Sequence, residues 1–323
     1  MRILKGIAAL ALVAAFAAAC TGGSSPTAAP AAAPTAAPTA VPSTAPTAAP
    51  TEAPTATPDA CAPANLALKA AGALTVGADN PAYPPYFAHR EGGNTPPWED
   101  SDYTGDPTTG QGFESAVAYA IADRLGIAKD KVSWIVVPFT NSFAPGAKDF
   151  DFYITQVSYK PERAEAADLS EGYYTVLQSV VALKDSPLAK VTSIADLAAY
   201  TFGAQVGTTS YDTIVNTIKP TKEPQVFDTN DLAVEALKSG QIDGLVVDLP
   251  TADFVTNVQV ENAVAVGKFD TGTAEYFSVV LEKGSALTPC VNAAIKTLDD
   301  DGTLAGLVTS QLPFQDSVPA FTP

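Results

Sequence analysis

Two observations predict an α/β fold with mainly parallel sheets for the chain after residue 60. Short apolar, β-prone segments alternate with segments of helical periodicity, and the helical segments carry capping residues at their ends. The strands are expected at 74–77, 133–137, 152–156, 179–183, 202–205, 244–247 and 276–281.

The predicted helices have apolar residues every three or four positions or begin with a capping residue. Gly126 and Gly240 each follow an apolar stripe, and a glycine in the left-handed region ends many helices. Ser193 opens a capping-box pattern, and Pro289 after Thr288 is typical of a first helical turn. We expect helices at 113–125, from 193, from 210, at 231–239 and from 288.

Composition excludes several classes of function. The chain has 323 residues, of which 46% are hydrophobic, so a sizeable core can form. Its net charge of −17 argues against binding to nucleic acid, whose phosphates attract Lys and Arg, and against electrostatic adhesion to anionic lipid. His89 is the one histidine and there is no C-x-x-C pair, so a multi-histidine metal site and a zinc ribbon are excluded. We expect neither a metal nor a cofactor.

Residues 1–20 have the pattern of an export signal. A basic start is followed by an apolar stretch that is too short for a spanning helix, which needs about 20 residues. Small residues then precede Cys20, which resembles the lipobox of bacterial lipoproteins, in which the cysteine is acylated. We therefore expect an extracytoplasmic protein anchored to the cell membrane through Cys20; plain secretion after cleavage near Ala19 is the alternative.

Residues 21–60 consist almost entirely of Ala, Pro, Thr and Ser, with a proline at about every fourth position. This composition forms neither a packed core nor a helix, so we expect an extended, semi-rigid stalk. At ~3.1 Å per residue, about 35 residues could reach on the order of 100 Å. A low-complexity tail without a spacer role is the alternative.

Two cysteines remain in the part that is expected to fold. Cys61 lies at its beginning and Cys290 lies at the start of the last predicted helix. Because thiols of exported proteins commonly pair, we expect a disulfide between them.

The candidate binding residues lie in three segments, at 74–86, 155–174 and 203–248. Their order and spacing resemble the family 3 extracellular solute-binding proteins of polar amino acid ABC transporters, over about residues 65–315. The motifs that carry the resemblance are Gly77-Ala-Asp79-x3-Tyr83, Gly112-Phe113-Glu114, Lys160-Pro-Glu-Arg163, Asp168-Leu-Ser170 with Tyr173-Tyr174, Gln205-Val-Gly207-Thr208-Thr209, and Gly240-x2-Asp243-x4-Asp248.

The resemblance implies a two-lobed periplasmic-binding-protein fold of type II, with two hinge-linked α/β lobes and the ligand cleft between them. Lobe 1 is expected to contain 61–174 and 277–323, and lobe 2 to contain 179–272. The implied function is capture of a small zwitterion, an amino acid, for the permease subunits of an ABC importer, by a monomeric protein that is not an enzyme. A ligand-binding input module of a sensor and a dehydratase-like enzyme on the same fold are the alternatives.

A zwitterion needs an anion site and a cation site at a fixed separation. Arg163 offers a planar fork for a carboxylate, and it matches the arginine that does this in the family. Asp248 follows a predicted strand at an edge where α/β sites form, and it matches the acid that takes the ammonium group. Thr208 and Thr209 precede the helix expected from 210, whose free N–H groups suit the same carboxylate.

The remaining candidates come from the resemblance alone. Ser158 matches a hydroxyl beside the ligand, and Tyr83 matches an aromatic residue that flanks it. Asp79 belongs to the opening motif, and Gln156 replaces a small residue that is common at its position. Asp151 and Asp243 also match family positions, but we expect them to have structural roles. The alternative for Arg163 is a solvated surface charge, and the alternative for Asp248, Thr208 and Thr209 is a capping role.

The chain departs from the family pattern by a long insertion at 88–111, rich in Gly, Pro and Asp. Loops of this size are often functional, so it is a candidate roof for the cleft. The segment from Asp100 weakly resembles a calcium loop, but Gln111 stands where that loop has glutamate.

Overall fold

The computed structural model describes residues 59–270, 275–312 and 317–323. The predicted export signal at 1–20, with Cys20, and nearly all of the predicted stalk at 21–60 lie outside the described residues. Within those residues, no helix has the length and apolar character that crossing a membrane would require.

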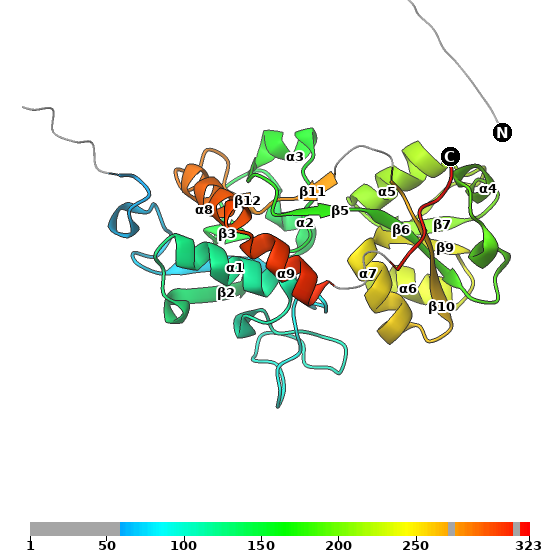
Figure 1. Cartoon of the computed structure of the whole chain (residues 1–323), viewed down its shortest axis with the longest axis horizontal. Helices are drawn as coiled ribbons and strands as arrows, with labels where there is room; N and C mark the ends of the chain where they lie inside the picture. Colours follow the sequence, from blue (N-terminus) through cyan, green and yellow to red (C-terminus); the bar gives the residue numbers. More distant parts are fainter. Residues whose placement is uncertain (1–58, 271–274, 313–316) are drawn as a thin grey trace, which may run out of the picture. The chain divides into compact units, whose positions relative to one another are not determined.

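The first sheet has five strands in the order β2-β1-β3-β12-β4 (Figure 1). Strand β1 is parallel to β2 and to the central strand β3, while β12 is antiparallel to β3 and β4. Its elements are β1 (Leu74–Ala78), β2 (Val132–Val136), β3 (Phe152–Tyr153), β4 (Asp168–Leu169) and β12 (Val280–Leu281), with α2 (Phe139–Ser142) and α3 (Pro161–Ala166) between strands.

Three helices cover this sheet and form the core of the first lobe. They are α1 (Phe113–Arg124), α8 (Thr288–Asp300) and α9 (Thr303–Gln311), which contact one another. Phe113, Val117 and Ile121 follow one face of α1 and are fully buried, as the predicted stripe requires. They share a cluster with Val291 and Ile295 of α8, so the lobe has a continuous core.

The second sheet also has five strands, in the order β10-β6-β9-β7-β8. Its strands β7, β8 and β9 are parallel, and β6 and β10 are antiparallel to their neighbours. The elements of this lobe are β6 (Gln178–Leu183), α4 (Ile194–Leu197), β7 (Phe202–Gln205), α5 (Thr209–Thr213), β8 (Gln225–Phe227), α6 (Asn230–Lys238), β9 (Gly244–Asp248), α7 (Leu249–Phe254) and β10 (Ala263–Lys268).

Two strands connect the lobes. β5 (Tyr174–Val176) leads into the second sheet and β11 (Glu275–Phe277) leads back, and the two pair antiparallel. The segment expected as one strand at 276–281 is therefore divided between β11 and β12. The strand expected at 152–156 is shorter, since β3 ends at Tyr153, and Gln156 has a φ of 44°, which a strand does not accept.

The chain crosses to the second lobe once more at its end. Phe321 joins the core of the second lobe, and Thr322 and Ala320 form bridges with Ser193 and Lys268. The assignment of all of 277–323 to the first lobe is therefore wrong for the last residues. The reason is a tertiary contact, since the ring of Phe321 packs on Phe269 at 5.1 Å between ring centroids.

Two carboxylates that were predicted to be structural form hydrogen bonds with the backbone near the starts of strands. Asp151 accepts hydrogen bonds from the backbone N–H groups of Lys69 and Thr75, at 2.7 and 2.6 Å. Asp243 accepts one from Thr201 N at 2.8 Å. A disulfide joins Cys61 to Cys290, whose Cα atoms are 5.3 Å apart, and so ties the start of the folded part to α8.

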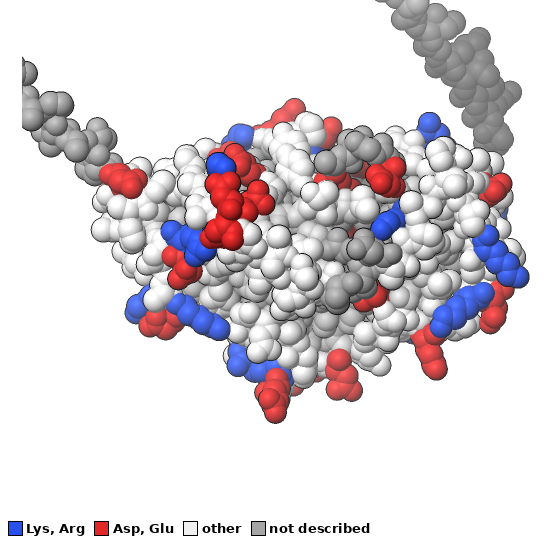
Figure 2. All heavy atoms as spheres, in the orientation of Figure 1, with Lys and Arg blue, Asp and Glu red and all other residues white. Residues whose placement is uncertain are grey.

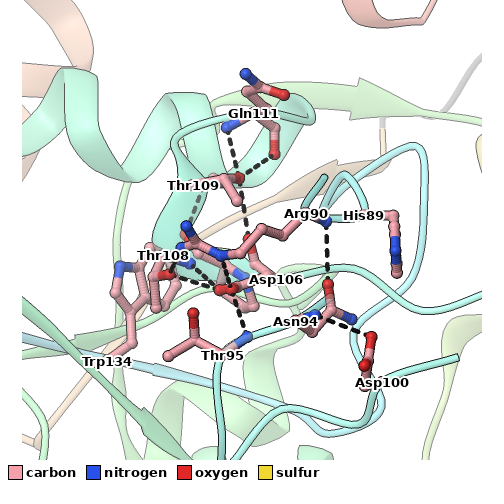
Figure 3. A network of polar contacts seen from close by, with 12 residues as sticks. His89, Arg90, Asn94, Thr95, Asp100, Asp106, Thr108, Thr109, Gln111 and Trp134 are labelled. Carbon is pink, nitrogen blue, oxygen red and sulfur yellow. Dashed lines mark hydrogen bonds and ion pairs between the residues drawn. The ribbon is translucent and has the colours of Figure 1, made fainter. Parts of the chain in front are cut away.

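The insertion at 88–111 is organised around Asp106, which is fully buried (Figure 3). Its carboxylate accepts hydrogen bonds from Arg90 Nε at 2.6 Å, from Thr95 N at 2.9 Å and from Thr108. Burial raises the pKa of Asp106, but the hydrogen bonds from Thr108 and Arg90 outweigh it and lower the pKa to about 2. The insertion is thus a loop with its own network of hydrogen bonds and an ion pair between Arg90 and Asp106.

On the face drawn in Figure 2 most atoms are uncharged, and acidic and basic side chains lie in small groups. Charge is therefore not gathered into one broad basic surface on this face.

Candidate functional site

A cavity of about 140 Å³ is lined by residues of both lobes. The first lobe contributes the loop after β1 and the turn after β3, and the second contributes the N-terminal turns of α5 and α6 and the end of β9. Parallel strands of both sheets end here, which is where α/β sheets commonly bind ligands.

Arg163 enters the cavity from α3 and is 6% exposed. Its guanidinium donates to the carbonyl oxygens of Ser158 and, across to the second lobe, of Gly207, the latter at 2.7 Å. The rings of Phe143 and Phe139 flank it, with centroids 4.5 and 5.6 Å from Cζ. Burial lowers its pKa to about 10. Among the described residues Arg163 forms no salt bridge, so its charge is buried without an anion.

Asp248 lies at the end of β9 and also lines the cavity. Its Oδ1 accepts a hydrogen bond from Gln178 Nε2 at 2.6 Å. Burial, and then the neighbouring charge of Glu275, raise its pKa well above the usual value. Within the described part of the chain it has no salt bridge, so a half-buried carboxylate without a cation faces the same cavity as Arg163.

Five other predicted residues line the cavity: Asp79, Tyr83, Gln156, Thr208 and Thr209. Burial raises the pKa of Asp79 to about 6, against hydrogen bonds from the backbone of Asn80 and Phe139 that lower it. Thr208 caps α5, because its Oγ1 accepts from Tyr211 N at 3.3 Å. Its hydroxyl thus has a structural role as well as a place in the wall.

Gln156 lines the cavity from the turn after β3, and a buried acid holds it there. Glu114, fully buried in α1, accepts hydrogen bonds from the backbone N–H and the side-chain amide of Gln156 and from the hydroxyl of Tyr173. Burial raises the pKa of Glu114 to about 7, although these bonds lower it. The polar side chain that replaces a small residue is therefore anchored behind the cavity.

Ser158 does not line the cavity. It is 2% exposed, and its hydroxyl donates to Glu275 Oε1 at 2.5 Å in place of pointing into the open space. No residue of 88–111 lines the cavity either; Tyr103 of the insertion instead lines a neighbouring hollow together with Asp231 and Gln259.

Sequence reasoning missed Asp231, which lines the main cavity from the first turn of α6. Its Oδ2 accepts from the hydroxyl of Tyr83 at 2.5 Å, which joins the two lobes. The sequence does indicate the start of this helix, because Thr229 is its N-cap. The short strand β8 that precedes Thr229 was not predicted, so nothing placed this helix start at the end of a strand.

Several polar contacts link the lobes around the cavity, and three of them involve a charged group. They are the bond from Arg163 to Gly207 O, the bond from Tyr83 to Asp231, and an ion pair between Lys160 and Asp212. The structure therefore has the cavity closed on more than one side.

Comparison with known proteins agrees with this architecture. The sequence pattern of the bacterial extracellular solute-binding proteins, family 3, matches residues 75–310. The chain is 27% identical over 202 residues to the arginine-binding extracellular protein ArtP of Bacillus subtilis (strain 168), which covers 61% of this chain and 75% of the relative. It is 29% identical over 215 residues to the ABC transporter glutamine-binding protein GlnH of the same organism, covering 61% and 71%.

Solved structures show the same fold. An ancestral arginine-binding protein bound to arginine is similar with a TM-score of 0.59 and 25% identity, covering 74% of this chain and 98% of that one. The ancestral amino acid-binding protein AncCDT-1, described as a precursor of cyclohexadienyl dehydratase, has a TM-score of 0.58 and 25% identity, covering 74% and 95%. The predicted two-lobed fold of type II is confirmed.

Proposed function

Because the chain belongs to the bacterial extracellular solute-binding proteins of family 3, we propose that it captures an α-amino acid between its lobes and delivers it to an ABC importer. The observation that carries the proposal is the pair of opposite charges on one cavity. Among the described residues, Arg163 is buried without an anion and Asp248 is half-buried without a cation. An α-carboxylate and an α-ammonium group would neutralise both.

The names of the relatives support an amino acid as the ligand. They include proteins described as binding arginine, histidine, glutamine and glutamate. These ligands share the α-carboxylate and α-ammonium groups and differ in the side chain. What they share is what Arg163 and Asp248 are suited to bind.

Ligand binding is expected to favour closure of the two lobes. Arg163 belongs to the first lobe and Asp248 to the second, and β5 and β11 connect the lobes. A ligand that contacts both charges has its full affinity only for the closed form, so it shifts the population toward that form. The permease of an importer would then distinguish the loaded protein from the empty one.

The attachment of the protein belongs to the same proposal. As a member of an extracellular family, the protein works outside the cytoplasmic membrane. We propose that an acylated Cys20 anchors it there as a monomer and that residues 21–60 act as a stalk. Support comes from the lipobox-like sequence and from the repeated prolines.

The test begins with native mass spectrometry of the purified protein, which identifies any amino acid that copurifies. Each bound amino acid is then titrated calorimetrically beside its N-acetylated and decarboxylated derivatives. Loss of one buried charged partner costs about 2–5 kcal/mol, so each derivative should bind at least ~30-fold more weakly. A derivative that binds as tightly as the parent amino acid contradicts the assignment of that charge.

Catalysis is the second candidate, and it has one specific observation in its favour. The carboxyl groups of Asp79 and Asp248 line the cavity with raised pKa values, as those of general acids do. We propose binding without turnover, because the same two groups are explained as partners for a ligand's positive charge. Following the bound ligand by NMR in the presence of the protein decides between the two, since an enzyme converts it.

A further inference from the structure

We infer that the ligand carries a second positive charge, on a long side chain, and that Asp231 together with Asp79 forms the subsite for it. The ligand class is a cationic α-amino acid. This inference rests on the proposed function, because it assumes that Arg163 and Asp248 hold the α-carboxylate and the α-ammonium group.

The charges on the cavity wall are unequal. Three carboxylates line it, those of Asp79, Asp231 and Asp248, against the single guanidinium of Arg163. Within the described residues, none of the four forms a salt bridge with another protein group. A neutral zwitterion would match Arg163 and Asp248 and leave two carboxylates without a cation. An occupant with one negative and two positive groups reduces that excess.

The desolvation of two of these acids, Asp79 and Asp248, agrees with the charge count. Burial raises the pKa of Asp79 to about 6 and is also the main cause of the raised pKa of Asp248. A cation placed beside a buried carboxylate reverses such a shift, because it favours the ionised form. The cavity wall is thus short of positive charge, and a ligand can supply it.

Apolar residues lie beside Asp231 where the main cavity continues. A smaller hollow adjoins the main cavity, and the two share Asp231, Tyr83 and Val247 in their walls. Apolar residues line this hollow beyond the shared wall, among them Leu245 and Phe254. Methylene groups can lie against such residues while the terminal cation reaches the carboxylate at the border.

Asp231 has acceptor capacity left for that cation. Its Oδ2 accepts one bond from Tyr83 and its Oδ1 one weak bond from Gln259 Nε2, at 3.3 Å. An ionised carboxylate offers about four acceptor positions, so a guanidinium or ammonium group can be added without displacing Tyr83.

The test compares L-arginine with L-citrulline, which has nearly the same shape but a neutral urea in place of the guanidinium. We expect calorimetric titration of the wild-type protein to show arginine binding at least ~30-fold tighter than citrulline, as for a buried charge that gains its partner. Agmatine, which lacks the carboxylate, should bind far more weakly than arginine.

Substitutions locate the subsite. Asp231→Asn and Asp79→Asn should each lower the affinity for arginine about tenfold or more while changing that for citrulline less than about threefold. Tyr83→Phe keeps the charge of Asp231 and removes only the bond between the lobes, so it should weaken both ligands alike and preserve their ratio. Glu235→Gln, one turn along α6 with a side chain 66% exposed, is the matched control and should leave both affinities unchanged.

The outcomes separate this inference from the proposed function. Citrulline or glutamine binding as tightly as arginine overturns the second cation, while the amino acid assignment stands. An unchanged ratio of arginine to citrulline affinity in Asp231→Asn overturns the subsite. Agmatine binding as tightly as arginine, or no binding of any α-amino acid, overturns the proposed function instead.

Discussion

Two cations only three residues apart join the lobes, and they should differ greatly in their effect on binding. Arg163 is 6% exposed and lies between two aromatic rings, whereas the side chain of Lys160 is 27% exposed and that of its partner Asp212 is 40% exposed. The perturbation is Arg163→Ala, with Lys160→Ala as the matched control. Both remove a positive charge from the same side of the cleft.

The magnitudes follow from burial. Losing the partner of a buried charge costs about 2–5 kcal/mol, so Arg163→Ala should weaken ligand binding by ~30-fold to several thousand-fold. It also leaves the carbonyl oxygens of Ser158 and Gly207 without this donor. An exposed ion pair contributes about 0.2–1 kcal/mol, so Lys160→Ala should weaken binding by about fivefold at most.

The assay is calorimetric titration with the copurified amino acid, together with thermal unfolding to establish that each variant is folded. Arg163→Lys is the second variant, because it retains the charge but lacks the planar fork, and it should also bind much more weakly than wild type. Wild-type affinity in a folded Arg163→Ala protein would refute the site. Equal losses in Arg163→Ala and Lys160→Ala would refute the reasoning from burial.

Four further predictions concern pH, the disulfide and the anchor. The affinity for a cationic amino acid should fall as the pH drops below about 6, because protonation of Asp79 removes a negative charge, and titration of Asp79→Asn should show a weaker pH dependence. Burial gives Glu114 a pKa of about 7 in the folded protein, above its ordinary value of 4.5, so its contribution to stability is full below 4.5 and is lost as the pH rises through 7. Thermal unfolding should therefore show a decrease in stability from pH 5 to pH 8 that Glu114→Gln reduces; an equal decrease in both proteins would speak against it. Reduction of the bond between Cys61 and Cys290, which are 229 residues apart, should lower the unfolding free energy by up to ~5 kcal/mol, as denaturant titration with and without reductant measures, while the affinity stays the same. Cys20→Ser should release the protein from the membrane fraction or leave an unprocessed precursor, and fractionation of the processed variant with membranes would contradict acylation as the anchor.

Much of the fold could be predicted because local patterns agree with it. The strand at 202–205 lies where the alternation placed it, and the stripe at 113–125 became α1. The failures are at places where tertiary contacts decide. Gln156, expected inside a strand, lies in a turn where it bonds to Glu114, 42 residues away, and Phe321 packs in the core of the second lobe on Phe269. No window of sequence contains such partners.

The residues of the candidate site likewise include some that sequence motifs predicted and one that they did not. Arg163 and Asp248 could be named because ordered motifs of a known family contain them, and both line the cavity. Ser158 was named for the same reason, yet its hydroxyl is turned toward Glu275. Asp231 belongs to no such motif, and it reaches the cavity because a three-residue strand, too short for a periodicity signal, directs the chain to that point. The residue that we propose to select the side chain of the ligand, Asp231, is thus the one that pattern reasoning reveals least.

The same unmatched charges connect ligand binding to stability. In the empty protein Asp79, Asp248 and Arg163 are desolvated without ion-pair partners among the described residues, and this costs free energy that ordinary packing must offset. A ligand that neutralises them binds the folded form alone, so it should raise the unfolding free energy by about 2.7 kcal/mol at a concentration of 100 times its Kd. Replacing the charges with neutral residues of similar shape should therefore make the empty protein as stable or more stable, while removing most of the stabilisation by ligand. A site that weakens the protein when empty and strengthens it when full is consistent with selection for binding at these residues, since folding alone gives no reason to retain them.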